Sequence, residues 1–237
     1  QVPDVRTIVV PLGGGGLLAG VALAVKALRP DVRVVGVQAA SAAAYPRSLK
    51  EGRPTRLEEM PTMADGIAVG QPGEINFPII AEHVDEVRTV SEESISRALL
   101  TLIERAKQVV EPAGAVGVAA VMDDPGAFAD GPVCVVLSGG NVDPLLLGKV
   151  IRHGMNAAGR YLPLSVTVPD QPGALAELLA AVSETGANVL DVHHMRTERG
   201  LRLDEVGVHL QLETRGEKHA SRVLDALRGR GYAATTP

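Results

Sequence analysis

The 237-residue chain has few aromatic side chains and no tryptophan. Tyrosine occurs three times and phenylalanine twice, and the formal net charge at pH 7 is −5. Nucleic-acid binding ordinarily requires a basic face or aromatic side chains on which bases stack. The sequence offers neither, so we expect no nucleic-acid partner.

The sequence also contains a single cysteine, Cys134, and no long uninterrupted apolar run. One cysteine cannot form a disulfide within a chain, and a membrane-spanning helix needs about 20 mostly apolar residues. No signal peptide is recognisable, and we therefore expect a cytoplasmic protein without a membrane partner. Residues 132–141 predict a buried strand that runs into a glycine loop, with Cys134 as an inert core residue.

Glycine, by contrast, is abundant, and four glycines are consecutive at 13–16. They lie between a strand-like apolar segment at 5–10 and an alanine- and leucine-rich helical segment at 17–30. A second strand-like segment follows at 32–38. Strand, loop, helix and strand in this order form a βαβ unit, which predicts a parallel sheet.

Helical and strand-like segments continue to about residue 157. Apolar spacing typical of a helix begins after Ser91, a residue type that favours the N-cap, and extends to Ala106. Small residues at 113–122 predict a helix that is buried on most sides, and residues 143–157 predict a helix after the second glycine loop.

The pattern changes near Arg160. An alternating strand is followed by an amphipathic helix that stops at Gly186, then by two strands, a second helix and a short last strand. The order βαββαβ is that of the ferredoxin-like fold. The sequence therefore predicts an α/β chain with two domains, at 1–158 and 162–237.

A glycine loop that joins a parallel strand to a helix favours an anion site, because backbone N–H groups converge there and the helix dipole attracts negative charge. Gly14, Gly16 and Ala19 fit a loose dinucleotide motif, but the next strand ends in Gln38 rather than an acidic residue for a ribose. The lysine of a P-loop is also missing. A compact monophosphate, such as that of pyridoxal phosphate, remains; the structural alternative is a tight turn that needs positive φ.

Four ordered segments, VPLGGGGLLAG, TMADG, VVEPAGAVGVAA and VLSGGNVD, resemble the C-terminal half of the threonine ammonia-lyases (threonine dehydratases). These are tryptophan-synthase-β-like, fold-type II pyridoxal-phosphate enzymes, and serine racemase is a close relative. From residue 162 the chain resembles an ACT domain, through VTVPDQPGALAELL and GANVLDVHHMR. The resemblance implies the parallel-sheet half of a fold-type II pyridoxal-phosphate domain, followed by a ferredoxin-like ACT regulatory domain.

The resemblance also implies residues that bind the cofactor. Ser138 would hydrogen-bond the pyridine nitrogen, and Glu111 would lie near the ring and the substrate. A neutral hydroxyl at that nitrogen does not enforce a proton there, which suits β-elimination. The residues that would hold the cofactor phosphate are Gly13, Gly14, Gly15, Gly16 and Leu17.

Members of the family deaminate L-threonine to 2-oxobutanoate and ammonia. Their catalytic Schiff-base lysine belongs to a motif of the N-terminal half, and this sequence contains no such motif. We therefore expect the chain, which begins at Gln1, to be a fragment that is inactive alone. The alternatives are a serine dehydratase or serine racemase-like enzyme, and a stand-alone amino-acid-sensing regulatory protein.

Metal binding is not expected. Serine racemase-like members place acidic ligands just after the strand that matches 32–38, where this sequence has Gln38 and the run AASAAA. Divalent cations prefer carboxylates, which favours the lyase over the racemase. His193 and His194 are adjacent on a predicted strand and would point to opposite faces, so they form a poor metal pair.

The ACT resemblance implies an amino-acid effector, with isoleucine or valine expected, bound between paired domains of a homo-oligomer. The alternative is that the residues concerned only shape a turn and that the domain only dimerises. The expected effector-binding residues are Asp170, Gln171, Pro172, Gly173, Ala174, Leu175 and Asn188.

Overall fold

The structure, a computed structural model, describes residues 2–196 and 200–236. It divides into two compact units, Gln1–Gly154 (unit 1) and Met155–Pro237 (unit 2). Within the described residues, no helix combines the length and the apolar character that crossing a bilayer requires.

Unit 1 is built on a four-stranded parallel sheet, as the βαβ pattern predicts. Its strands lie in the order β3-β2-β1-β4. They are β1 (Thr7–Pro11), β2 (Arg33–Ala39), β3 (Glu86–Val90) and β4 (Val133–Val135). Because every strand runs the same way, all their carboxyl ends, and the loops that follow, lie at one edge of the sheet.

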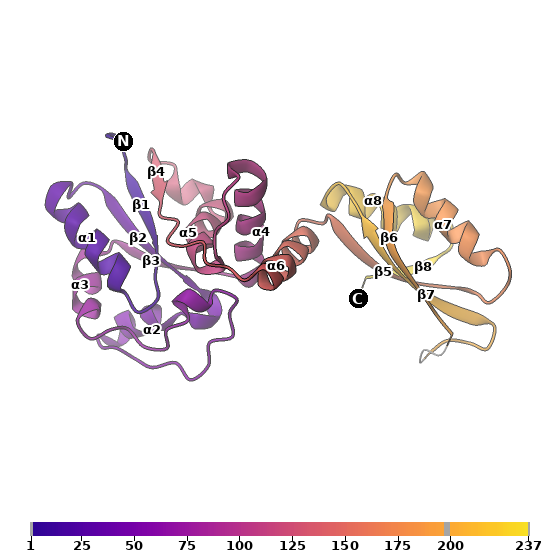
Figure 1. Cartoon of the computed structure of the whole chain (residues 1–237), viewed down its shortest axis with the longest axis horizontal. Helices are drawn as coiled ribbons and strands as arrows, with labels where there is room; N and C mark the ends of the chain where they lie inside the picture. Colours follow the sequence, from indigo (N-terminus) through magenta and orange to yellow (C-terminus); the bar gives the residue numbers. More distant parts are fainter. Residues whose placement is uncertain (1, 197–199, 237) are drawn as a thin grey trace. The chain divides into compact units, whose positions relative to one another are not determined.

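Helices cover both faces of this sheet (Figure 1). One face packs against α1 (Gly16–Leu28) and α3 (Asn76–His83), and the other against α4 (Glu92–Thr101) and α5 (Pro112–Asp123). The result is one apolar core on each side of the sheet. The other helical segments are η1 (Ala40–Ala42), α2 (Ala44–Glu51), η2 (Asp65–Ile67), η3 (Leu102–Ala106), η4 (Pro125–Phe128) and α6 (Pro144–Ala157).

The small-residue helix expected at 113–122 is α5, and its glycines explain the composition. A Cβ on Gly117 would lie 2.7 Å from Cγ1 of Val135 and 3.3 Å from Cγ1 of Val9. The helix backbone therefore rests directly on two strands of the sheet. Only glycine permits this approach at Gly117.

The helix expected from Ser91 to Ala106 begins as predicted but changes form before its end. The Ser91 hydroxyl caps α4 by accepting a hydrogen bond from the backbone N–H of Ser94, at 3.1 Å. The α-helix stops at Thr101 and continues as the π-helical η3. Lys107 then adopts a left-handed conformation with φ 57°, which ends the helix.

The expectation of a buried strand around Cys134 is wrong, because Cys134 is exposed. The strand β4 has three residues and pairs with β1 at the edge of the described sheet. Val135 packs towards α5, so Cys134 points to the opposite face. The core on that face is centred on α1 and does not include β4.

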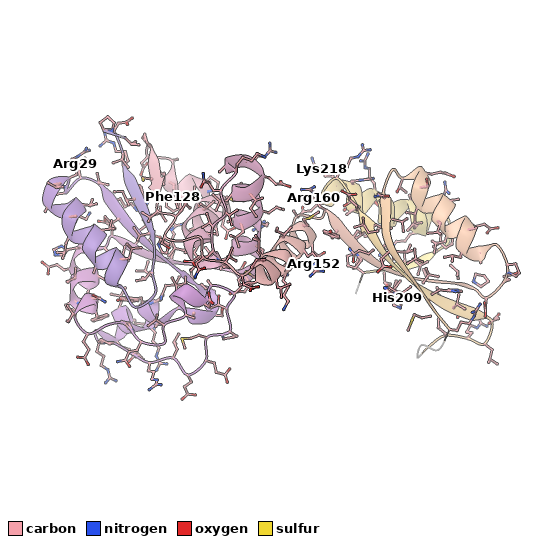
Figure 2. The ribbon with its side chains drawn as sticks, in the orientation of Figure 1. Arg29, Phe128, Arg152, Arg160, His209 and Lys218 are labelled. Atoms are coloured by element: carbon pink, nitrogen blue, oxygen red, sulfur yellow. The ribbon has the colours of Figure 1, made fainter. Side chains whose placement is uncertain are left out.

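The buried ring of Phe128, labelled in Figure 2, packs beneath two arginine side chains of the sheet. The guanidinium groups of Arg33 and Arg88 lie over this ring, 5.6 Å and 5.0 Å from its centroid. Arg33 also donates a hydrogen bond to the carbonyl of Ala127, at 2.8 Å. These contacts attach η4 to the sheet at the edge away from the glycine loop.

Unit 2 has the predicted ferredoxin-like order of elements. Its antiparallel sheet has the strand order β6-β7-β5-β8, and alternate residues of β5 are buried, as a half-buried strand requires. The elements are β5 (Tyr161–Pro169), α7 (Ala174–Glu184), β6 (Asn188–Met195), β7 (Glu205–Glu213), α8 (Glu217–Gly229) and β8 (Ala233–Thr235).

Candidate functional site

The four glycines join the carboxyl end of β1 to the start of α1. Gly15 is the N-cap of this helix, with φ 100°, a left-handed conformation that favours glycine. The loop opens into a cavity of about 200 Å³, which also receives Ser138 from the second glycine loop. The complete lining is Pro11, Gly13, Gly14, Gly15, Gly16, Leu17, Gly66, Ile67 and Ser138.

The backbone N–H groups of the loop are available to a ligand. From residue 13 to residue 18, none of these N–H groups donates a hydrogen bond to a residue that the structure describes. The first N–H of the helix to do so belongs to Ala19, which donates to the carbonyl of Gly15 at 2.9 Å. Unpaired N–H groups that begin a helix bind anions, since the helix dipole adds to their attraction.

The four-glycine loop at residues 13–16, called the cradle from here on, has no room for side chains on the side away from the cavity. A Cβ on Gly15 would overlap Oη of Tyr45 and would lie 2.8 Å from Cδ1 of Ile80, and one on Gly13 would lie 3.1 Å from Cα of Ile67. The loop backbone therefore packs closely against its neighbours on one side and faces the cavity on the other. This arrangement fits a phosphate group that is bound by main-chain N–H groups.

The second glycine loop is locked to the start of α5. The N–H of Glu111 donates to the carbonyl of Gly139 at 3.1 Å. A Cβ on Gly139 would overlap the Glu111 carboxylate, and one on Gly114 would lie 3.1 Å from the Gly139 carbonyl oxygen. The glycine after Ser138 therefore lets the loop approach α5, and the exposed Ser138 side chain lines the same cavity as the four glycines.

Glu111 lies beside the cradle cavity, and the structure does not place it in that cavity's lining. It lines a neighbouring cavity of about 450 Å³. A Cβ on Gly66, which lines the cradle, would be 3.7 Å from Oε1 of Glu111. The second cavity is lined by Asp65, Glu111, Pro112, Asn141, Val142, Asp143, Pro144 and Leu146.

Two side chains that the sequence did not single out hold the cradle from behind. The Tyr45 hydroxyl and the Asn76 side-chain amide each donate a hydrogen bond to the carbonyl of Gly14, at 3.1 Å. Both come from the segment between residues 39 and 90, where the pattern was least informative. No local signal marks them, because their partner is 31 or 62 residues away in the chain.

Gln38 ends β2, where a dinucleotide site or a metal site would have an acidic residue. Its side chain instead makes hydrogen bonds within the protein. Its side chain is completely buried. Its Oε1 accepts a hydrogen bond from the N–H of Tyr45 at 2.9 Å, and its Nε2 donates to the carbonyl of Ala42 at 3.4 Å. The amide thus fixes the turn into α2. The described residues contain no group of three or more His, Cys, Asp or Glu side chains arranged to hold a metal ion.

In unit 2 the turn from Asp170 to Gly173 is exposed and joins β5 to α7. Arg196, just after β6, donates two hydrogen bonds to the Asp170 carboxylate, both at 3.2 Å, and this contact holds the pKa of Asp170 below its usual range. Asn188 begins β6 and lies at the opposite end of the same strand. Within one copy of unit 2, the structure therefore does not bring Asn188 to the turn.

Two sequence families match this chain. The family described as "Pyridoxal-phosphate dependent enzyme" matches residues 1–139, and the family described as "ACT domain" matches residues 164–231. The first match spans more than half of the chain, so the chain belongs to the pyridoxal-phosphate-dependent enzymes. Its cofactor is accordingly pyridoxal phosphate, as predicted, and an ACT domain follows the cofactor-binding part.

Individual relatives are 32–44% identical to the chain. The chain is 44% identical to the L-threonine ammonia-lyase of Thermotoga maritima over 232 residues, which are 98% of this chain and 58% of the relative. The solved threonine deaminase isoform 2 of Solanum lycopersicum, in its processed form, is 32% identical, with a TM-score of 0.62, over 65% of this chain and 45% of that one. Maize serine racemase is 34% identical, with a TM-score of 0.59, over 66% of this chain and 49% of that one.

The chain spans a little over half the length of the curated relative that it matches from end to end. The resemblance to threonine ammonia-lyases and to the ACT domain, which the motifs indicated, is confirmed by these matches.

Proposed function

We propose that this chain supplies the cofactor-phosphate cradle and the regulatory domain of an L-threonine ammonia-lyase, which converts L-threonine to 2-oxobutanoate and ammonia. The observation that carries the proposal is the convergence around one cavity of Ser138 and residues 13–17, whose N–H groups have no acceptor among the described residues. The 44% identity to an L-threonine ammonia-lyase supports the substrate, because it extends over both units.

Each predicted residue has a distinct task in this proposal. Residues 13–17 bind the phosphate through their N–H groups, and Ser138 hydrogen-bonds the ring nitrogen with a hydroxyl that carries no charge. Glu111 lines the second cavity and would lie near the ring and the substrate. Bound pyridoxal phosphate supplies the electron sink that makes loss of the α-proton and the β-hydroxyl possible.

Regulation belongs to unit 2 in this proposal, with isoleucine or valine as the effector. Asn188 and the turn that begins at Asp170 lie at opposite ends of one copy. They form one binding site when the turn of one copy meets β6 of a second copy. Effector binding and homo-oligomerisation are therefore linked.

The substrate is tested on the protein expressed from its complete reading frame, with L-threonine and L-serine compared by kcat/KM. We expect the higher value for L-threonine, with 2-oxobutanoate and ammonia formed in equal amounts. Higher turnover of L-serine to pyruvate, or formation of D-serine, would contradict the proposal; the second result is the one that the likeness to maize serine racemase raises. Isoleucine binding without pyridoxal-phosphate binding would instead indicate a stand-alone sensor.

The effector site is tested by calorimetry with isoleucine and valine, together with the oligomeric state from analytical ultracentrifugation. We expect Gln171→Ala, in the turn, and Asn188→Ala to weaken binding of the same effector. Glu177→Ala, on the exposed side of α7, is the matched control and should leave binding unchanged. Binding by monomers, or binding that neither substitution affects, would contradict the assignment.

A further inference from the structure

One carbonyl in the glycine loop accepts three hydrogen bonds. The oxygen of Gly14 receives the backbone N–H of Gly73 at 3.0 Å, the Tyr45 hydroxyl at 3.1 Å and the Asn76 side-chain amide at 3.1 Å. A carbonyl oxygen has two lone pairs and ordinarily accepts one or two hydrogen bonds. The three donors come from outside the loop, so this peptide is held by the rest of unit 1.

The direction of this carbonyl determines the direction of the next N–H. A peptide group is planar and trans, so its C=O and its N–H point in opposite directions. Holding the oxygen of Gly14 towards Tyr45 and Asn76 therefore turns the N–H of Gly15 away from them. Gly15 lines the cradle cavity, and its N–H has no acceptor among the described residues.

The carbonyl of Gly14 has an alternative partner that it does not use. In a regular first helical turn, the N–H of Leu18 would donate to this oxygen, as the N–H of Ala19 donates to the oxygen of Gly15. The structure shows no bond from Leu18 to Gly14. Because Gly15 is the N-cap, with φ 100°, the Gly14 carbonyl lies outside the helix, and its three hydrogen bonds come from residues elsewhere in unit 1.

The same two side chains enforce glycine at position 15. A Cβ there would overlap Oη of Tyr45 and would lie 3.0 Å from Cβ of Asn76. The Tyr45 side chain is completely buried, and burial raises its pKa to about 12. Its hydroxyl therefore keeps its proton, and remains a donor to Gly14, throughout the neutral range.

We propose that Tyr45 and Asn76 are positioning residues, which hold the Gly14–Gly15 peptide so that its N–H points at the phosphate of the bound cofactor. The inference rests on the proposed assignment of residues 13–17 to that phosphate. Neither side chain lines the cradle cavity, so both act through the backbone and do not touch the ligand. The pair selects for a phosphate group and contributes nothing to binding of the ring.

The test compares pyridoxine 5′-phosphate with pyridoxine, each titrated by calorimetry into the cofactor-free protein expressed from its complete reading frame. Neither probe has an aldehyde, so neither can form a Schiff base with a lysine. The ratio of the two dissociation constants therefore measures the contribution of the phosphate group to binding. We expect Tyr45→Phe and Asn76→Ala each to weaken binding of the phosphate-bearing probe by about 3- to 10-fold, as the loss of one orienting hydrogen bond predicts. Binding of pyridoxine should stay unchanged.

Two controls separate positioning from general damage. Tyr232→Phe, between α8 and β8, makes the same chemical change in unit 2 and should leave both constants unchanged. In ¹H–¹⁵N spectra, inorganic phosphate should shift the Gly15 amide downfield in the wild type and less in Tyr45→Phe. Should Tyr45→Phe fail to fold, Asn76→Ala, at the half-buried start of α3, decides the question alone.

The outcomes distinguish this inference from the function on which it rests. If the wild type prefers the phosphate-bearing probe and both variants keep that preference, the positioning role is overturned and the cradle stands. If the wild type binds the two probes equally, the cradle assignment falls, and the positioning role falls with it. If the wild type prefers the phosphate-bearing probe and the variants lose that preference, the result supports both the cradle assignment and the positioning role.

Discussion

Many glycines serve one purpose in unit 1 and another in unit 2, although Gly159 of unit 2 combines a positive φ with close contact to Glu217. In unit 1, glycines allow close approach: a Cβ on Gly36 would lie 2.5 Å from Cδ2 of Leu18, and one on Gly117 would meet Val135. In unit 2, Gly173 and Gly231 have positive φ, and a Cβ on either would meet nothing within 4 Å. Glycine in the first case is required by packing, and in the second by backbone conformation.

This difference reflects how each sheet is built. The parallel sheet of unit 1 carries helices on both faces, and its small residues bring main chain close to main chain and to the cavity. The antiparallel sheet of unit 2 has a regular ladder with alternating burial, and its glycines lie mainly in turns. The proposed binding of a phosphate by main-chain N–H groups draws on this close packing in unit 1.

The largest loss of stability is expected at Gly15, where close packing and a left-handed backbone conformation both require glycine. We expect Gly15→Ala to destabilise unit 1 by about 3 kcal/mol, since overpacking adds to the cost of a left-handed backbone. Gly173→Ala has nearly the same φ in open space and should cost unit 2 about 1 kcal/mol. Hydrogen exchange read by mass spectrometry follows each unit separately, and equal losses in the two variants would contradict the distinction.

A polar contact of unit 2 is expected to have the next largest effect. The buried His219 accepts a hydrogen bond from the N–H of Arg215 at 3.1 Å, so its other ring nitrogen donates to the carbonyl of Thr185 at 2.8 Å. The ring thus ties the start of α8 to the end of α7. We expect His219→Leu to destabilise unit 2 by about 2 kcal/mol, because both partners lose a bond.

The control for this substitution is His194→Ala on the exposed part of β6, which should change the stability of unit 2 by less than about 0.5 kcal/mol. Urea unfolding followed by exchange-protected amides of β5 and β7 provides the measurement. An unchanged midpoint for His219→Leu would show that packing alone joins the two helices.

Smaller changes in the stability of unit 1, of opposite sign, are expected for substitutions at two of its helical glycines. Gly117→Ala should destabilise it by about 1 kcal/mol, since overpacking against Val135 exceeds the gain in helix propensity. Gly20→Ala, in α1 with open space around it, should stabilise unit 1 by about 1 kcal/mol. Thermal unfolding of both variants checks the signs, and two stabilising substitutions would contradict the close packing of α5.

The smallest effect is a pH dependence at Asp85, which precedes β3. Burial alone would raise the pKa of its carboxyl, but hydrogen bonds from Lys26 at 2.7 Å and from the N–H of Val34 at 2.6 Å outweigh it and hold the pKa below the usual value. A lowered carboxyl pKa stabilises the fold above the usual range near pH 4, and the stabilisation is lost as the pH falls through the folded-state pKa.

The substitution Asp85→Asn should therefore flatten the acid limb of the stability curve between neutral pH and about pH 3. Asp130→Asn, at an exposed position, serves as the control and should leave the curve unchanged. The measurement is the urea midpoint of unit 1 as a function of pH. Parallel curves for the wild type and Asp85→Asn would exclude this contribution.

Local patterns were sufficient for most elements and for the location of the cradle. The apolar segments before and after the four glycines predicted β1 and β2, and alternation predicted β5, because burial on one or both faces leaves its period in the sequence. The exposure of Cys134 was not predictable, since an apolar segment looks the same at the edge of a sheet as in its middle.

The sequence by itself determined the α/β order of unit 1, the ferredoxin-like order of unit 2 and the glycine loop between β1 and α1. Only the tertiary structure decided that Tyr45 and Asn76 meet at the carbonyl of Gly14, and that Asn188 lies away from the turn after β5. Periodicity reports which residues one element buries. Contacts between residues distant in the chain depend on how the elements pack, and they leave no local pattern.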